Sequence, residues 1–463
     1  MKYFAFAIAM IMTIPGAFVC GISKRVFAFA LAVMILPILK FDSLALNFVS
    51  WEFYRGTARG MEVSLVYIVA FMLLAAVFFK RQRLKIIPDF GFVIFLAYFA
   101  WALVSSFGVI TTEVESVIAG GFFRESFTLD GRMLAFFELW KMGMMALVFL
   151  AVYNAIDHLK GPKAVFGALG TVTIGIFILV VKEHFAGVYQ ARGPFPHQNS
   201  MALFMMLIVP VFYAAYLTLP KSGFRTLLSV AFVCGSGALF RTYSRGAMAM
   251  FPVAVAITTA FTAFFRLSAR LAARMLPLVA IALVGFTLLV PKIVSRFENA
   301  PKQSGDTRKW FAITALNVVS EHPLAGVGVN NWSNFVSANP ELQDEEFRPS
   351  GTTSSQIGIV ETIYLLVLAE CGIPGLALLV AWFFYYWCVA LKLTVKLART
   401  RYFAIPAGLL GGMTGCFIQS CLEWVLKQQI NFILLMIVFA TLAWMNRHLR
   451  ELTADTGKPA EES

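Results

Sequence analysis

Apolar stretches recur along the whole chain and are separated by short polar segments. Many are about 17 to 25 residues long, which is enough to cross the hydrocarbon core of a bilayer as a helix with internally satisfied backbone groups. The pattern predicts an all-α fold, a polytopic bundle of about 12 or 13 transmembrane helices. The predicted spans are residues 3–20, 26–40, 61–79, 90–110, 133–153, 164–182, 200–219, 226–240, 248–265, 275–291, 362–390, 402–420 and 430–446.

The first twenty residues resemble a signal peptide, but they lack a small-residue cleavage site and a second apolar run follows at once. We therefore interpret them as the first membrane helix. The second run is short, so a re-entrant pair or a single crossing before residue 40 would place the N-terminus inside. Neither alternative changes the assignment after residue 60.

Four short loops carry lysine and arginine without any acidic residue, which is typical of cytoplasmic loops. They are residues 80–85, 221–225, 266–274 and 392–401. These loops share one side of the membrane if the N-terminus is outside. The opposite face, predicted to be periplasmic, then carries residues 41–60, 111–132, 184–199, 241–247 and 292–361.

We expect three parts in the chain. Residues 1–446 form the transmembrane helical domain, and residues 292–361 form a periplasmic loop subdomain with short helices, inserted between late spans. Residues 447–463 form a polar cytoplasmic tail.

Composition agrees with a membrane protein, because 59% of the residues are hydrophobic and only 14% are charged. The net charge of +13 is spread over many short loops rather than along one stripe, so it gives no support to nucleic-acid binding. The six cysteines lie in or beside apolar spans without metal-ligand spacing. Neither an Asp-x-Asp motif nor a phosphate-cradling glycine loop is present, so we expect no metal and no nucleotide cofactor.

The segment Ala191-Arg-Gly-Pro-Phe-Pro-His-Gln-Asn199 directly precedes a predicted membrane helix. Its two prolines fix the backbone, so Arg192 is held near the bilayer surface. A guanidinium there can bind phosphate oxygens in pairs, with Asn199 adding polar contacts. Equally, Arg192 suits an interfacial arginine and Asn199 a helix N-cap.

The segment Arg241-Thr-Tyr-Ser-Arg-Gly246 is a short turn between two apolar spans. Arg245 would lie at the outer mouth of the bundle, where an uncompensated cation is costly unless an anion binds. A structural salt bridge is the alternative, although few acidic residues flank the turn.

In the long loop, the spacing of Trp310, Ile313, Leu316 and Val319 predicts a helix that starts near Arg308. Pro323 should end this helix and present His322 at its end, and Gly326 and Gly328 would let the next segment approach a ligand closely. Histidine is a common general base because its imidazole titrates near neutral pH. A hydrogen-bonding role at the helix end is the alternative.

Three segments together resemble the O-antigen ligase and polymerase superfamily of bacterial membrane glycosyltransferases. They are Arg192-Gly-Pro-Phe-Pro-His-Gln-Asn199, Ser244-Arg-Gly246 and His322-Pro-Leu-Ala-Gly-Val-Gly-Val-Asn-Asn-Trp332. With the layout of spans, the resemblance covers roughly residues 60 to 446. In one place the chain departs from the family, because many members have a His-Asn pair where this chain has Glu361-Thr-Ile-Tyr364.

The resemblance implies a periplasm-facing enzyme of the bacterial inner membrane that uses a glycan on undecaprenyl diphosphate as donor and needs no metal. Arg192 and Arg245 would hold the diphosphate, and His322 would activate the acceptor hydroxyl. Arg308 would contact phosphate or glycan. The other positions assigned to substrate binding are Asn199, Ser244, Gly326, Gly328, Asn331 and Glu361.

The acceptor stays open between lipid A-core, a growing glycan and a protein, which correspond to a ligase, a polymerase and an oligosaccharyltransferase. We expect inversion at the anomeric carbon, because no carboxylate nucleophile is evident. A transporter of lipid-linked glycans, which makes no bond, is the alternative from another class. Transporters usually place ionisable residues near mid-membrane, whereas this chain gathers its arginines at one face.

Overall fold

The computed structural model describes residues 2–50, 54–80, 83–109, 114–118, 126–129, 131–277, 302–347 and 357–454. The chain divides into two compact units. Unit 1 comprises Met1–His158, Pro301–Phe384 and Ser420–Ile437, and unit 2 comprises Leu159–Ala300, Tyr385–Gln419 and Val438–Ser463. Each unit is described by itself.

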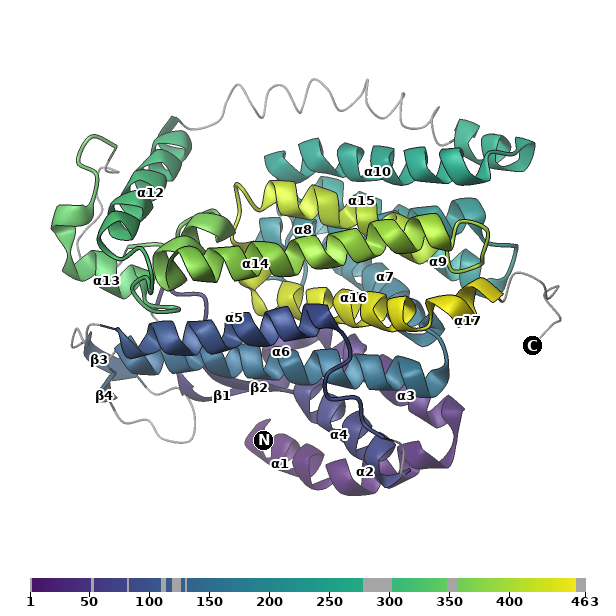
Figure 1. Cartoon of the computed structure of the whole chain (residues 1–463), viewed down its shortest axis with the longest axis horizontal. Helices are drawn as coiled ribbons and strands as arrows, with labels where there is room; N and C mark the ends of the chain where they lie inside the picture. Colours follow the sequence, from purple (N-terminus) through teal and green to yellow (C-terminus); the bar gives the residue numbers. More distant parts are fainter. Residues whose placement is uncertain are drawn as a thin grey trace. The chain divides into compact units, whose positions relative to one another are not determined.

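Within the described ranges, nine helices are long and apolar enough to cross a membrane (Figure 1). The prediction of an all-α polytopic bundle is confirmed, and the protein is a multi-pass membrane protein. Three shorter apolar helices accompany the nine: α2 (Thr13–Ile22), α4 (Leu65–Phe79) and α15 (Ala404–Gln419). The nine are Lys24–Leu44 (α3 with the 3-10 helix η1), α5 (Phe90–Phe107), α6 (Gly131–Leu159), α7 (Lys163–Phe185), α8 (Gln198–Thr218), α9 (Gly223–Arg241), α10 (Arg245–Arg266), α14 (Ile363–Lys396) and α16 (Gln429–Arg447).

The first predicted span is divided into two helices, α1 (Lys2–Ile11) and α2. They are separated at Met12, where the backbone leaves the ideal helical geometry with ψ of −3°. Pro15 explains the division, because it lacks an N–H and crowds the carbonyl of the residue four positions earlier. The predicted span 275–291 falls almost entirely outside the described residues.

Two strand pairs were not predicted from the sequence. β1 (Ala45–Ser50) pairs antiparallel with β2 (Gly60–Ser64), directly before α4. β3 (Val114–Ile118) pairs antiparallel with β4 (Ser126–Leu129). The apolar run that predicted a span from residue 61 includes β2, so α4 has only 15 residues. Short strands next to long apolar runs are masked by those runs in a hydropathy pattern.

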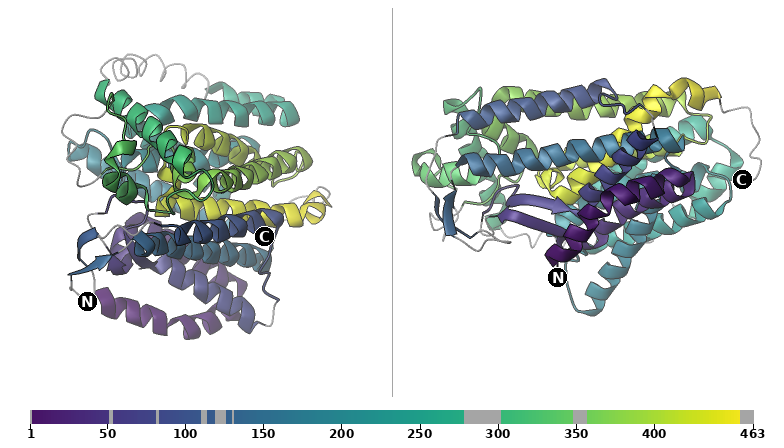
Figure 2. Two further views of the ribbon diagram at one scale, coloured as in Figure 1. Left: turned by 60° about the vertical axis from the view of Figure 1, so that its left-hand side comes forward. Right: turned by 90° about the horizontal axis from the view of Figure 1, so that it is seen from below.

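Unit 1 also holds α12 (Lys302–Glu321), α13 (Trp332–Ala338) and the short helices η2 (Pro340–Leu342) and η3 (Val425–Lys427). Helices α5 and α6 run side by side (Figure 2), and the rings of Phe92 and Phe149 stack between them at 4.7 Å. A second core joins α12 and α13 around Trp310 and Trp332, each only 1% exposed. This core fixes the part of the predicted loop subdomain that the structure describes.

Unit 2 is built around α8, almost every residue of which is buried. Glycines on α15 let this helix pack closely against α8. A Cβ at Gly412 would lie 2.5 Å from the carbonyl oxygen of Leu207, and one at Gly408 would overlap the backbone of Val211. Small residues four positions apart are the usual means by which membrane helices approach each other closely.

We predict that Gly408→Val destabilises the protein by about 1 to 3 kcal/mol, because the added side chain forces α8 and α15 apart. The check is the thermal unfolding of the detergent-purified protein. Gly143→Ala in α6 is the control, since a Cβ there meets no atom within 4 Å and stability should not fall. Equal melting temperatures for Gly408→Val and the wild type would refute the tight packing.

Candidate functional site

His322 lies directly after α12, at the end of the helix that its sequence predicts. Its backbone N–H donates to the carbonyl of Val318 at 2.9 Å, which is the last helical bond before Pro323. The half-buried imidazole makes an edge-to-face contact with Phe335 at 5.4 Å. Within the described residues its ring nitrogens make no hydrogen bond.

The loop after His322 lies against a break in α14. At this break Gly372 has a φ of +67°, and Pro374 lacks the N–H that a continuous helix would direct at the carbonyl of Glu370. The loop supplies the missing donors, because Val327 N–H donates to Ala369 O at 3.0 Å and Gly328 N–H donates to Glu370 O at 2.9 Å. In return, Ile373 N–H donates to Pro323 O at 2.9 Å.

Gly326 and Gly328 adopt positive φ angles of +67° and +92°. A Cβ at Gly326 would lie 2.5 Å from the backbone of Glu370, and one at Gly328 would overlap the side chain of Val109. In this structure the two glycines therefore allow a close approach to α14 and to Val109. Their assignment to substrate binding stays a prediction.

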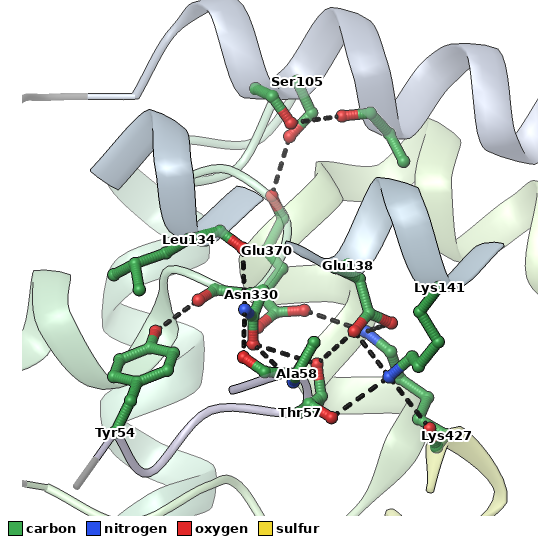
Figure 3. Close-up of polar contacts among 12 residues, drawn as sticks. Tyr54, Thr57, Ala58, Ser105, Leu134, Glu138, Lys141, Asn330, Glu370 and Lys427 are labelled. Atoms are coloured by element: carbon green, nitrogen blue, oxygen red, sulfur yellow. Dashed lines mark hydrogen bonds and ion pairs between the residues drawn. The ribbon is translucent and has the colours of Figure 1, made fainter. Parts of the chain in front are cut away.

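Four buried charged side chains lie close to Asn330 of the loop after His322 (Figure 3). Glu138 and Lys141 of α6 form an ion pair at 2.6 Å. Lys427 of η3 lies 3.5 Å from Glu138 and 3.0 Å from Glu370 of α14. All four side chains are less than 10% exposed. Two carboxylates and two ammonium groups leave the cluster with no net charge, as burial in a membrane protein requires.

Asn330 connects the loop after His322 to this charge cluster. Its amide oxygen accepts from Ala58 N–H at 3.1 Å, and its amide nitrogen donates to the carbonyls of Ala58 and Leu134 at 2.8 and 2.7 Å. The Thr57 hydroxyl lies 3.1 Å from the same amide oxygen and 2.7 Å from Glu138. The hydroxyl of Tyr54 donates to the Asn330 carbonyl.

The sequence prediction selected Asn331 and missed Asn330. Asn331 is fully buried and donates to Val327 O at 3.0 Å, within its own loop. Asn330 has a φ of +59°, a conformation that asparagine tolerates better than most residues. Its position in a glycine-rich loop was the only sign in the sequence of this role.

The charged cluster and its burial shift the pKa of two groups outside the membrane spans, Lys427 and Tyr54. Burial alone would lower the pKa of Lys427, but the carboxylates of Glu370 and Glu138 outweigh it and raise that pKa well above its ordinary value. Burial, reinforced by the same carboxylates, also raises the pKa of Tyr54. Lys427 therefore stays protonated and Tyr54 stays a neutral donor.

Arg308 lies in α12 and pairs with two carboxylates. Its Nε contacts Glu361, the residue at which the chain departs from the family pattern, and its Nη2 lies 3.6 Å from Glu423. The group of three carries one net negative charge. Arg308 and His322 are fourteen residues apart, about 21 Å along a helix, so they do not face the same atom of a substrate.

Arg192 belongs to unit 2 and lies in the loop between α7 and α8. The carboxylate of Glu183 accepts from the backbone N–H groups of Arg192 and Gly193, both at 3.0 Å, and so fixes the loop. The guanidinium itself is exposed and makes one long bond, 3.5 Å, to Pro196 O. His197, rather than Asn199, is the N-cap of α8, and its ring accepts from Asn199 N–H.

Arg245 is the first residue of α10 in unit 2, directly after the tight turn at Tyr243, whose φ is +49°. Its partly exposed guanidinium has no ion pair or hydrogen bond within the described residues. Ser244 is buried and does not cap the helix with its side chain.

The ten predicted site residues are thus divided between the units. His322, Arg308, Gly326, Gly328, Asn331 and Glu361 belong to unit 1, and Arg192, Asn199, Ser244 and Arg245 belong to unit 2. In unit 1 the structure brings Arg308 and Glu361 into contact, and Arg308 is separated from His322 by most of the length of α12. In unit 2, Arg192 and Asn199 share one loop, and Ser244 and Arg245 are adjacent at the start of α10.

We predict that Lys427→Met destabilises the protein by about 3 to 5 kcal/mol, because Glu370 then loses its ion pair and the buried cluster keeps an uncompensated negative charge. The double variant Lys427→Met with Glu370→Gln restores a neutral cluster and should recover part of that loss. Thermal unfolding of the two purified variants measures both effects. A double variant less stable than the single one would contradict the charge balance.

Comparison with known proteins agrees with the motifs. Residues 230–380 match the sequence model of a family described as O-Antigen ligase. The matched region contains Ser244-Arg-Gly246 and the segment from His322 to Trp332. No curated protein matches the chain. The resemblance to the O-antigen ligase superfamily is therefore confirmed over residues 230–380 of this membrane protein.

Proposed function

We propose that this membrane glycosyltransferase of the O-antigen ligase and polymerase type moves a glycan from undecaprenyl diphosphate to an acceptor hydroxyl. The observation that carries the proposal is that the region matched to the O-antigen ligase family contains both an unpaired arginine and an unpaired histidine. These are Arg245 and His322, whose side chains make no ion pair or hydrogen bond within the described residues. Polar groups left without partners are suited to bind and convert a substrate.

In the proposed reaction the acceptor oxygen attacks the anomeric carbon of the glycan. A new carbon–oxygen bond forms while the bond from that carbon to the diphosphate oxygen breaks, and undecaprenyl diphosphate leaves with the electron pair. His322 takes the proton of the acceptor hydroxyl. A single displacement inverts the anomeric carbon.

The leaving group gains negative charge as the bond breaks, so fixed cations near it stabilise the transition state. Arg192 and Arg245 serve this role in the proposal. Both guanidinium groups have free donors, and planar guanidinium donors fit phosphate oxygens in pairs. No metal is required if these arginines supply the positive charge.

The pairing of Arg308 favours a contact with glycan over a contact with phosphate. Two carboxylates, Glu361 and Glu423, surround its guanidinium, and their net negative charge repels a diphosphate. Carboxylates and a guanidinium together offer acceptors and donors for sugar hydroxyls. We therefore assign Arg308 and Glu361 to the glycan of the donor or the acceptor.

We also propose that the site faces the periplasm from the bacterial inner membrane, as the basic loops indicate. The identity of the acceptor is tested by examining a deletion strain for its missing product. Loss of capped lipopolysaccharide indicates a ligase, loss of long-chain polysaccharide a polymerase, and loss of a glycoprotein a protein acceptor. A strain that keeps all three products would refute the proposed function.

We predict that His322→Ala and Arg245→Ala each lower glycan transfer by at least about 100-fold, as removal of a general base or of transition-state charge stabilisation does. Transfer is measured with purified enzyme and a lipid-linked donor, by the gel shift of the product. His448→Ala, after the last span, is the matched histidine control and should keep full activity.

The His322→Ala and Arg245→Ala variants should insert and melt like the wild type, because neither Arg245 nor the His322 ring holds a hydrogen bond that folding would lose. Full transfer activity in His322→Ala would remove it from the reaction. If the wild-type protein transports the lipid-linked glycan but forms no glycosidic bond, the transporter alternative is favoured instead.

A further inference from the structure

The start of α10 has backbone donors for which the described part of the chain provides no acceptor. The N–H groups of Arg245, Gly246 and Ala247 have no partner four residues earlier in the helix, and the Ser244 side chain does not cap them. The first turn contains no acidic residue. A helix start in this state carries a partial positive charge and attracts anions.

A buried amide lies against this turn. Gln419, the last residue of α15, is 1% exposed, and neither its Oε1 nor its Nε2 has a hydrogen-bond partner within the described residues. A Cβ at Gly246 would lie 3.3 Å from Nε2, so the absence of a side chain there leaves the amide beside the start of α10. A buried amide without partners is costly to the folded protein, which indicates that a ligand satisfies it.

The surroundings favour an anion over a neutral ligand. Arg241 and Arg245 flank the turn, and the Nε of Arg241 is also buried without a partner in the described part of the chain. The carboxylate of Glu183, near the end of α7, already accepts two backbone N–H groups of the loop that follows α7. Arg245 and Gly246 are partly exposed, so a ligand can reach the turn.

We propose that Gln419 donates a hydrogen bond from Nε2 to a phosphate oxygen of the donor's diphosphate, at a site completed by the start of α10 and Arg245. This assignment rests on the proposed function and adds a residue to its donor site. The neutral amide holds the phosphate without adding charge, and Arg245 supplies the charge. Gln419 is therefore a binding residue for the diphosphate, distinct from the proton transfer assigned to His322.

The test measures the affinity of purified full-length protein for undecaprenyl diphosphate by native mass spectrometry. Gln419→Leu should weaken binding about 10-fold or more, as loss of a buried bond to a charged group does. Gln419→Glu should weaken it further, because a carboxylate then faces the phosphate. Thr258→Val, an isosteric change three turns further along α10, is the control and should bind like the wild type.

Thermal stability without ligand separates binding from a structural role. Gln419→Leu should melt at the same temperature as the wild type or higher, because the replaced amide has no partner to lose. A lower melting temperature for Gln419→Leu would overturn the proposal. Equal retention of phosphatidylglycerol and undecaprenyl diphosphate would also overturn it, since the site would then take any anionic lipid headgroup.

Failure of this inference is distinct from failure of the proposed function. If Gln419→Leu binds undecaprenyl diphosphate like the wild type while Arg245→Ala does not, Gln419 is excluded and the proposed donor site stands. If Arg245→Ala also binds normally, the donor site itself is wrong. His322→Ala should keep its affinity under either result, because it acts on the acceptor.

Discussion

The exchange of backbone hydrogen bonds at the break in α14 determines where the loop after His322 lies. Pro374 removes one helical donor and Gly372 turns the chain away, which leaves the carbonyls of Ala369 and Glu370 without their usual partners. The loop satisfies both carbonyls from its own N–H groups. Unsatisfied backbone groups are especially costly in a membrane protein, so this exchange holds the loop more firmly than side-chain contacts alone would.

The cluster of four buried charges also holds the loop after His322 in place. Glu370 shares its backbone carbonyl with the loop and its carboxylate with Lys427. Asn330 extends the contact to the segment around Ala58 and to α6. Because each buried charge is compensated, removing a single partner costs far more than any one hydrogen bond contributes. These contacts fix the backbone that follows His322, whose ring makes no hydrogen bond within the described residues.

The sequence predicted most of the helices, because long apolar runs and basic loops follow directly from the physics of the bilayer. It did not predict the strand pair β1–β2, whose residues are included in or border on apolar runs. It predicted the end of α12 correctly, since Pro323 excludes a helical continuation. Lys427 and Asn330 were missed because their roles depend on contacts with residues more than 50 and 270 positions away.

Charged residues near the membrane fall into two classes that the sequence does not separate. Lys427 and Arg308 look in the sequence as available for ligands as Arg245 does, yet carboxylates neutralise the first two in the folded protein. Only tertiary structure shows which cations are compensated, since their partners are distant in the chain. A cation that is paired with a carboxylate contributes to the fold. A cation without such a pair, at the start of a helix, can instead attract an anionic ligand. Gln419 is a neutral example of the same distinction, because its buried amide has no hydrogen-bond partner within the described residues, and we therefore place it with Arg245 in the proposed donor site.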